Sequence, residues 1–256
     1  MIQYASLGSG SRGNGTLVAS GDDLLLVDCG FTIKEVERRM ARLGRKAEDL
    51  SALLVTHEHG DHLKGVAPLA RKFNLPVYMT PGTFRSKDHG KLPELRLIEG
   101  YQDFQIGSIL VEAVAVPHDA REPAQFIFNV GDVRLGVLTD LGNISPHVEA
   151  CYRDCDALVL EANHDSQMLA SGSYHYSLKQ RVGGPWGHLN NEQTAGFLLR
   201  ANLDRLQQLV VAHISQQNNS LERAKLALDE VTKQIPQVIY ACQDEGFEWL
   251  EVSLAP

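Results

Sequence analysis

The chain has 256 residues, 43 % of them hydrophobic and 22 % charged, and its formal net charge is −8. These proportions are ordinary for a soluble globular protein. No run approaches the roughly 18 consecutive apolar residues of a membrane helix, and residues 1–6 lack the basic and apolar regions of a secretory signal. The acidic balance argues against a broad basic surface for nucleic acid, so a polyanion would have to be held locally, by metal ions and a few cations.

The chain has four cysteines, and their spacing fits neither a disulfide framework nor a zinc ribbon. They are Cys29, Cys151, Cys155 and Cys242. We therefore expect reduced cysteines and a cytoplasmic protein. Exposed strand edges also lead us to expect that a homodimer can form.

Strand and helix patterns alternate in the first part of the chain. Strands are expected at Ile2–Leu7 and Thr16–Ala19, on either side of a glycine-rich loop at residues 8–15, and at Leu24–Val27. The periodicity predicts a helix from Ile33 to Leu43, whose alternating basic and acidic residues are typical of a solvated face. A strand at Ala52–Thr56, a helix at Leu63–Phe73 and a strand at Pro76–Met79 follow.

Strand signals dominate from Leu95 to Leu141, and helices and strands alternate after that. The expected strands are Ile109–Val116, Ala124–Val130, Val133–Thr139, Ala157–Leu160, Leu206–Ala212, Val238–Tyr240 and Phe247–Val252. The expected helices are Asn191–Asn202 and Leu221–Gln234. Two β-rich halves with outer helices predict one α/β domain over residues 1–256, in which two sheets pack face to face beneath helices.

The segment Thr56-His57-Glu58-His59-Gly60-Asp61-His62 stands where an apolar strand ends and a helix begins. Side chains at i and i+2 of an extended stretch point the same way, so His57 and His59 can bind one ion. Where the chain turns into the helix, Asp61 and His62 can face a second ion. Imidazole and carboxylate ligands suit Zn²⁺, and also Mn²⁺ or Fe²⁺.

These four ligands cannot complete two metal sites, so the rest of the chain should supply more. His118 and Asp140 each follow a β run. They are the chemical types that are needed, a further histidine for one ion and a carboxylate that bridges both.

The order Asp28, His57-x-His59-x-Asp61-His62, His118, Asp140 resembles the pattern of the metallo-β-lactamase superfamily. The resemblance implies a four-layer αββα sandwich with two metal ions at one edge of the sheets. It assigns the first ion to His57, His59 and His118, the second to Asp61 and His62, and the bridge to Asp140.

The superfamily pattern also implies a histidine near the C-terminal end that completes the second site. His213 is the best candidate because it ends an expected strand, and His188, which opens a helix, competes with it. The resemblance makes Asp28 a residue that orients the ligands.

Later motifs narrow the resemblance to one branch. Leu160-Glu161-Ala162-Asn163-His164-Asp165, the segments 187–190 and 213–219, and the early Ser9-Gly10-Ser11-x-Gly13-Asn14 resemble the YycJ (WalJ) family. That family is a compact nuclease branch related to ribonuclease Z and the β-CASP enzymes. The resemblance implies an exonuclease that cleaves phosphodiester bonds in DNA (or RNA).

The expected reaction is attack on phosphorus by a hydroxide that bridges two divalent ions. Asp61 would orient this hydroxide or accept its proton. His188 would bind a phosphate oxygen or protonate the leaving oxygen, and Glu161 would orient His188 or His213.

Several further residues are candidates for substrate binding. Lys179 and Arg181 precede His188 and would meet the phosphate backbone, and Asn14 belongs to a loop whose backbone amides would approach phosphate. The aromatic segment 174–176 could stack on a base.

Two other hydrolase classes would use the same metal ions. A cyclic-nucleotide or small-molecule phosphodiesterase suits the acidic net charge. A thioester or lactone hydrolase of the glyoxalase II type shares the first motif, although no substrate-binding helical extension is evident. A non-enzymatic binding module is disfavoured because the ligand set is complete.

Overall fold

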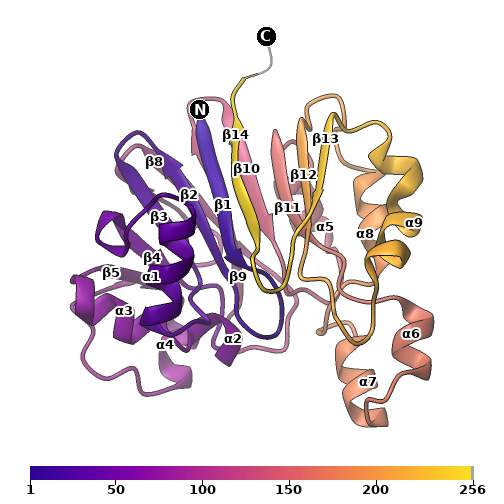
Figure 1. Ribbon diagram of the computed structural model, residues 1–256, viewed down its shortest axis with the longest axis horizontal. Coiled ribbons are helices and arrows are strands. Elements are labelled where there is room, and N and C mark those ends of the chain that lie inside the picture. Colours follow the sequence, from indigo (N-terminus) through magenta and orange to yellow (C-terminus); the bar gives the residue numbers. More distant parts are fainter. Residues whose placement is uncertain (255–256) are drawn as a thin grey trace.

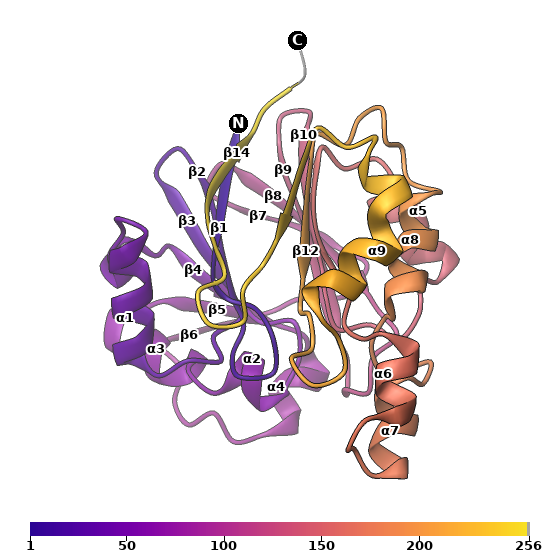
Figure 2. The same cartoon turned by 45° about the vertical axis from the view of Figure 1, so that its right-hand side comes forward.

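Two seven-stranded sheets face each other between layers of helices in the computed structural model, which describes residues 1–254 (Figure 1, Figure 2). The first sheet has the order β14 (Phe247–Val252), β1 (Ile2–Gly8), β2 (Gly15–Ser20), β3 (Asp23–Val27), β4 (Ala52–Leu54), β5 (Pro76–Met79), β6 (Glu94–Leu97). The second has the order β13 (Gln237–Tyr240), β12 (Gln208–Ala212), β11 (Ala157–Glu161), β10 (Val133–Leu138), β9 (Ala124–Val130), β8 (Ile109–Ala115), β7 (Asp103–Ile106). The expected four-layer αββα sandwich is confirmed.

Helices cover the outer faces of both sheets. The first half contains α1 (Ile33–Arg42), a 3-10 turn η1 (Ala47–Asp49), α2 (Gly60–Leu63), α3 (Val66–Phe73) and α4 (Pro81–Ser86). The second contains α5 (Pro146–Tyr152), α6 (Ser166–Ser171), α7 (Tyr176–Val182), α8 (Asn191–Leu198) and α9 (Leu221–Thr232). The pair α6 and α7 projects beyond the second sheet at the lower edge (Figure 1, Figure 2). Within residues 1–254, no helix has the length and apolar character needed to cross a bilayer.

Both sheets repeat one pattern of strand pairing. Neighbours are antiparallel from β14 to β3 and parallel from β3 to β6. Neighbours are likewise antiparallel from β7 to β10 and parallel from β10 to β13. Parallel strands end at the same edge of a sheet, which is where open α/β sheets bind ligands. The residues that follow β3, β4, β10, β11 and β12 therefore gather at one edge.

Three apolar layers hold the sandwich together. Along β3, Leu25 and Val27 face the opposite sheet, whereas Leu24 and Leu26 pack in the layer beneath α1 and α3. A third layer lies between the second sheet and the helices α5, α8 and α9. Strands that are buried on both faces appear in the sequence as uninterrupted apolar runs, and this is why the strand predictions succeeded.

The helix expected at Leu63–Phe73 is interrupted, and the prediction of one continuous helix was wrong. Gly65 lies in the break and donates its N–H to the carbonyl of Cys29 at 2.7 Å. A Cβ at this position would lie 1.9 Å from the carbonyl oxygen of Phe31. The chain passes so close to the loop after β3 that only glycine fits there.

The last strand also departs from the expected division into two halves. β14 follows β13 in the chain but crosses to the first sheet, where it pairs antiparallel with β1. The sequence pattern identified the strand correctly and gave no information about its partner.

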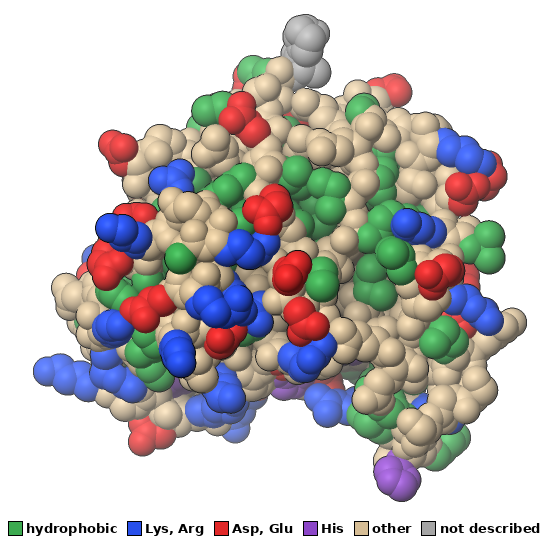
Figure 3. Space-filling model, viewed as in Figure 1, with side chains coloured by type: hydrophobic (Ala, Val, Ile, Leu, Met, Phe, Trp, Pro, Cys, Tyr) green, Lys and Arg blue, Asp and Glu red, His purple; other side chains and the backbone are tan. Residues whose placement is uncertain are grey.

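The basic run on α1 does not form a cationic patch. On the face drawn in Figure 3, Lys and Arg side chains alternate with Asp and Glu. Arg38 and Arg39 pair with Glu35, and Arg42 pairs with Glu248. This is the solvated, ion-paired face that the charge pattern indicated.

A glycine in the loop after β3 allows that loop to pack against α2. Gly30 donates its N–H to the carbonyl of Asn14 at 3.0 Å, and a Cβ at Gly30 would lie 1.9 Å from the carbonyl oxygen of Asp61. Gly60, in the metal motif itself, has no atom within 4 Å of the corresponding position.

We expect Gly30→Ala to lower the free energy of unfolding by about 1–3 kcal/mol, because the added methyl group displaces α2. Gly60→Ala is the matched control and should stay within about 0.5 kcal/mol of the wild type. Urea unfolding measures both values, and equal stabilities of the two variants would contradict this account of the close contact.

Candidate metal centre

Three imidazoles converge at the strand-end edge of the sandwich. His57 and His118 come after β4 and β8, and His59 directly precedes α2. Nε2 of His57 and Nε2 of His118 lie 3.0 Å and 3.2 Å from Nδ1 of His59. Two nitrogens bound tetrahedrally to one Zn²⁺ are about 3.3 Å apart. The spacing fits one ion held by the three histidines.

A second cluster lies beside the first and contains Asp61, His62 and His213. Nε2 of His62 lies 3.4 Å from Oδ2 of Asp61 and 3.4 Å from Oδ2 of Asp140. Nδ1 of His213 lies 3.2 Å from Oδ1 of Asp140. Since Asp140 also groups with His57 and His62, its carboxylate stands between the clusters, where it can bridge two ions.

Hydrogen bonds connect Asp28 to ligands in both clusters. Its carboxylate accepts hydrogen bonds from the backbone N–H of Thr56 at 2.9 Å, the hydroxyl of Thr56 at 2.8 Å and Nδ1 of His62 at 2.8 Å. The Thr56 hydroxyl accepts from Nδ1 of His57 at 2.9 Å. Because Nδ1 of both rings faces these oxygens, Nε2 faces the site, where that of His62 lies 2.9 Å from Nδ2 of Asn14. Asp28 thus contacts His62 directly and reaches His57 through Thr56, a partner that sequence reasoning missed. The orienting role of Asp28 stays a prediction.

Glu161 is fully buried at the end of β11 and joins two histidines. Its Oε2 lies 3.1 Å from Nδ1 of His188 and 3.5 Å from Nδ1 of His213. Its Oε1 accepts from the backbone N–H groups of Leu141 and Leu189, both at 3.0 Å. Glu161 is therefore a positioning residue that holds both histidines and the loops around them.

Four carboxylates of the site pair with no lysine or arginine within residues 1–254, unlike Asp119 of the cavity wall, which pairs with Arg181. They are Asp28, Asp61, Asp140 and Glu161, and their partners in ion pairs are histidines. Burial alone would lower the pKa of His62, but Asp140 and Asp28 raise that pKa well above its usual value. The protein itself thus creates an excess of negative charge at this edge.

Two divalent ions fit this donor set. Oδ2 of Asp140 and Nδ1 of His213 are buried and make no hydrogen bond in the described part of the chain. A buried polar atom without a partner costs about 1–3 kcal/mol, so such atoms call for an explanation. Two divalent cations at the imidazole and carboxylate clusters would occupy these atoms and balance the four carboxylates.

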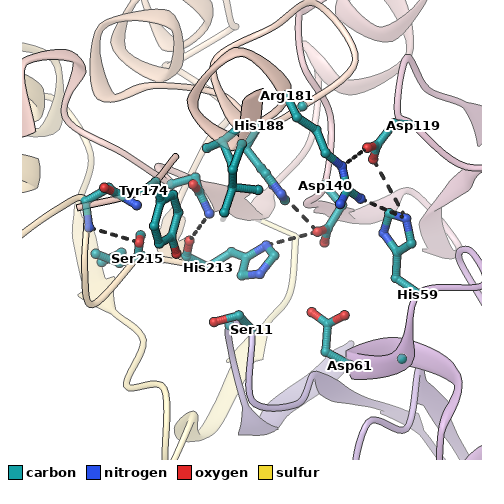
Figure 4. Close-up of a pocket in the computed structure, with 18 residues that line it drawn as sticks. Ser11, His59, Asp61, Asp119, Asp140, Tyr174, Arg181, His188, His213 and Ser215 are labelled. Carbon is teal, nitrogen blue, oxygen red and sulfur yellow. Dashed lines mark hydrogen bonds and ion pairs between the residues drawn. The ribbon is translucent and has the colours of Figure 1, made fainter. Parts of the chain in front are cut away.

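A cavity of about 370 Å³ opens above the clusters. His59, Asp61, Asp140, His188 and His213 line it, and Figure 4 shows their side chains directed inward. The reacting bond of a substrate in this cavity would therefore lie directly against the predicted metal ligands.

The predicted substrate-binding residues lie in different places. Arg181 lines the cavity and pairs with Asp119, which sequence reasoning missed although it directly follows His118. The ammonium of Lys179 donates to the carbonyl of Ala170 at 2.7 Å and lines a neighbouring pocket.

Asn14 lies beneath the metal cluster, and both ends of its side-chain amide are engaged within the protein. Its Nδ2 donates to Oδ2 of Asp61 at 3.2 Å, and its Oδ1 accepts from the N–H of Gly10 at 2.7 Å. These contacts make Asn14 a support for Asp61.

Comparison with known proteins identifies the family of the chain. A model of the beta-lactamase superfamily domain matches residues 24–214. The exodeoxyribonuclease YycJ of Bacillus anthracis is 35% identical over 237 residues, which cover 91% of this chain and 90% of that protein. The exodeoxyribonuclease WalJ of Streptococcus pneumoniae is 35% identical over 233 residues, which cover 89% and 87%.

The chain belongs to the metallo-β-lactamase superfamily, in the YycJ/WalJ family. The resemblance inferred from the motifs is thereby confirmed, and so is the prediction of a metal-dependent hydrolase. Among solved structures, the metallo-β-lactamase fold protein YhfI of Bacillus subtilis superimposes with a TM-score of 0.72, at 18% identity, over 98% of this chain and all of that one. This likeness shows the shared fold.

The pKa of His213 predicts how metal binding depends on pH. Burial lowers this pKa, but the carboxylates of Asp140 and Glu161 outweigh burial and raise it to about 10 in the metal-free protein. At neutral pH an ion must therefore displace a proton from His213, and the same holds for His62.

We expect Zn²⁺ binding to release protons, with an apparent affinity that rises with pH up to about 10. Asp140→Asn should bind the ion more weakly and release fewer protons, because the substitution removes the charge that keeps the histidines protonated. Titration calorimetry in buffers of different ionisation enthalpy counts the protons. Binding without proton release would contradict the charge distribution described above.

Proposed function

We propose that this protein is a two-metal exodeoxyribonuclease. One observation carries the proposal: seven metal-ligand candidates converge in the two clusters with the spacing that a pair of divalent ions requires, in a chain that shares 35% identity with proteins named exodeoxyribonucleases. The seven are His57, His59, Asp61, His62, His118, Asp140 and His213. The ions are Zn²⁺ or Mn²⁺, with Fe²⁺ as a further choice, since imidazole and carboxylate accept all three.

Two bound ions supply a nucleophile from water at neutral pH and stabilise the charge that develops on the phosphate. Asp61 stands at the second cluster with its Oδ2 held by Asn14, so it can orient the attacking water and accept its proton. Since Nδ1 of His188 faces Glu161, Nε2 is the nitrogen available to the substrate. We assign His188 to protonation of the leaving oxygen, with Glu161 keeping the ring in place.

Arg181 is the cation proposed to meet the phosphate. It reaches the cavity from α7 and its side chain is 57% exposed. The pair with Asp119 holds the guanidinium beside His59, and Nη2 of Arg181 lies 3.5 Å from Nε2 of His59. Lys179 lies outside this cavity, so it would meet only a more distant part of the strand.

A small phosphodiester is the second candidate, because the cavity is small and the chain carries a net charge of −8. A cytoplasmic location is also proposed, and it suits the four free cysteines. The homodimer through strand edges stays a prediction.

The function is tested with 5′-labelled DNA, matching RNA and a cyclic nucleotide, each incubated with the protein and Mn²⁺ or Zn²⁺ or without metal. We expect stepwise, metal-dependent shortening of the DNA, abolished in His59→Ala and retained in His147→Ala, which changes an exposed histidine of α5. Intact oligonucleotides from a protein that binds two ions would refute the nuclease. Hydrolysis of the cyclic nucleotide alone would then establish the second candidate.

The two competing histidines can be separated by experiment. His188→Gln should lower kcat by about 10²- to 10⁴-fold, the usual contribution of a general acid, while both ions still bind. His213→Gln should lose one ion, because His213 groups with Asp61 and His62, whereas His188 groups only with Asp140, Glu161 and His213. Metal analysis beside single-turnover rates measures both effects, and loss of an ion in His188→Gln would reverse the assignment.

A further inference from the structure

One wall of the metal cavity is not used by the proposed reaction. Tyr174, Leu178 and Val182 come from α7 and the residues before it, and Ile214 follows His213. In Figure 4, Tyr174 stands beside Ser215, on the side of the cavity away from His59 and Asp119. Apolar side chains thus line part of a cavity that also holds the metal clusters, next to the polar Ser215.

Helix geometry explains why α7 contributes an apolar strip. Leu178 and Val182 are four residues apart, so their side chains share one face of the helix. Both line the cavity, whereas Tyr176, Lys179 and Gln180 line the neighbouring pocket. The helix α7 therefore presents an apolar strip to the metal cavity, whereas residues of α6 line the neighbouring pocket.

The ring of Tyr174 is available for stacking. The side chain is half-buried, and among residues 1–254 its hydroxyl makes no hydrogen bond and its ring contacts neither an aromatic ring nor a cation. Aromatic side chains beside a nuclease site bind bases of any sequence, because every base has a π-face. A free ring next to a phosphate-cleaving centre therefore suits a nucleobase.

The size of the cavity limits what can reach that ring. A volume of about 370 Å³ lies near the lower end of the range for small-molecule pockets. With the phosphate at the clusters, the adjoining base would enter the space between Tyr174 and the loop that carries Ser11. A single base that has left the duplex suits a space of this size.

We propose that Tyr174, with Leu178, Val182 and Ile214, forms a subsite that stacks the base of the terminal nucleotide, which must be unpaired to enter. This inference rests on the proposed nuclease function and specifies which form of DNA the site accepts. The subsite would make the enzyme prefer single-stranded or frayed ends.

The first test compares two single-stranded oligonucleotides that differ only in the terminal nucleotide, which carries a base in one and is abasic in the other. For the wild type we expect the base to raise kcat/KM by about 5- to 150-fold, the range of one aromatic stacking contact. In Tyr174→Ala this ratio should fall to near one, and Tyr174→Phe should restore it.

Tyr176→Ala is the matched control. Tyr176 is two residues away, is 77% exposed and lines the other pocket, so its loss should leave the ratio unchanged. An equal loss on both oligonucleotides in Tyr174→Ala would mean a structural role and would overturn the proposal. If the wild type shortens neither oligonucleotide with any metal ion, the nuclease function itself has failed.

The second test uses a blunt duplex whose terminal base pair is covalently cross-linked. We expect the cross-linked end to resist digestion while the same duplex without the cross-link is shortened. Equal rates on the two duplexes would show that a paired base enters the site, and would overturn the proposal.

Discussion

The four carboxylates at the sheet edge are the constraint from which the rest of the site follows. Asp28, Asp140 and Glu161 are almost completely buried, and within residues 1–254 no lysine or arginine neutralises them. Buried charges without partners are strongly unfavourable. His62 and His213, whose pKa values are raised, balance part of this charge. His57 and His118 add nothing to the balance, because burial and neighbouring rings lower their pKa values. The edge is therefore complete only with cations, and its hydrogen bonds keep the ligand nitrogens aimed at them.

Backbone strain at the strand ends serves the same arrangement. Asp28, Asp140 and His213 follow β3, β10 and β12, and each has a positive φ, of 61°, 56° and 53°. This conformation is uncommon outside glycine, and it persists only where the surroundings enforce it. Asp28 and Asp140 occupy corresponding places in the repeated pairing pattern, at the first parallel strand of each sheet. The left-handed backbone conformation turns each carboxylate toward the strand-end edge. Each sheet therefore places one carboxylate at the metal centre in the same way.

The sequence predicted the parts of the site that lie directly after apolar strands, and it could not predict what depends on packing between distant segments. The buried strands were recognisable as apolar runs in the sequence. The His and Asp residues were recognisable because they directly follow these runs. Thr56 and Asp119 were missed because their roles arise only when β4 and α7 are brought beside other loops. The short helices α4 to α7 were also missed. They have six or seven residues each, with at most two of them buried, so their sequences show little core-facing period.

The acidic composition and a nucleic-acid substrate are compatible if recognition is confined to the cavity. Arginines on α1 are paired with glutamates, and Arg181 is paired with Asp119, so these cations release fewer counterions from DNA than unpaired ones would. In the proposed complex, the binding energy comes from the bound ions, one phosphate and one stacked base. An enzyme with so small a contact gains little from the interior of a duplex, because a strand end offers a terminal phosphate and its base together. The small size of the proposed contact thus favours an exonuclease over an endonuclease.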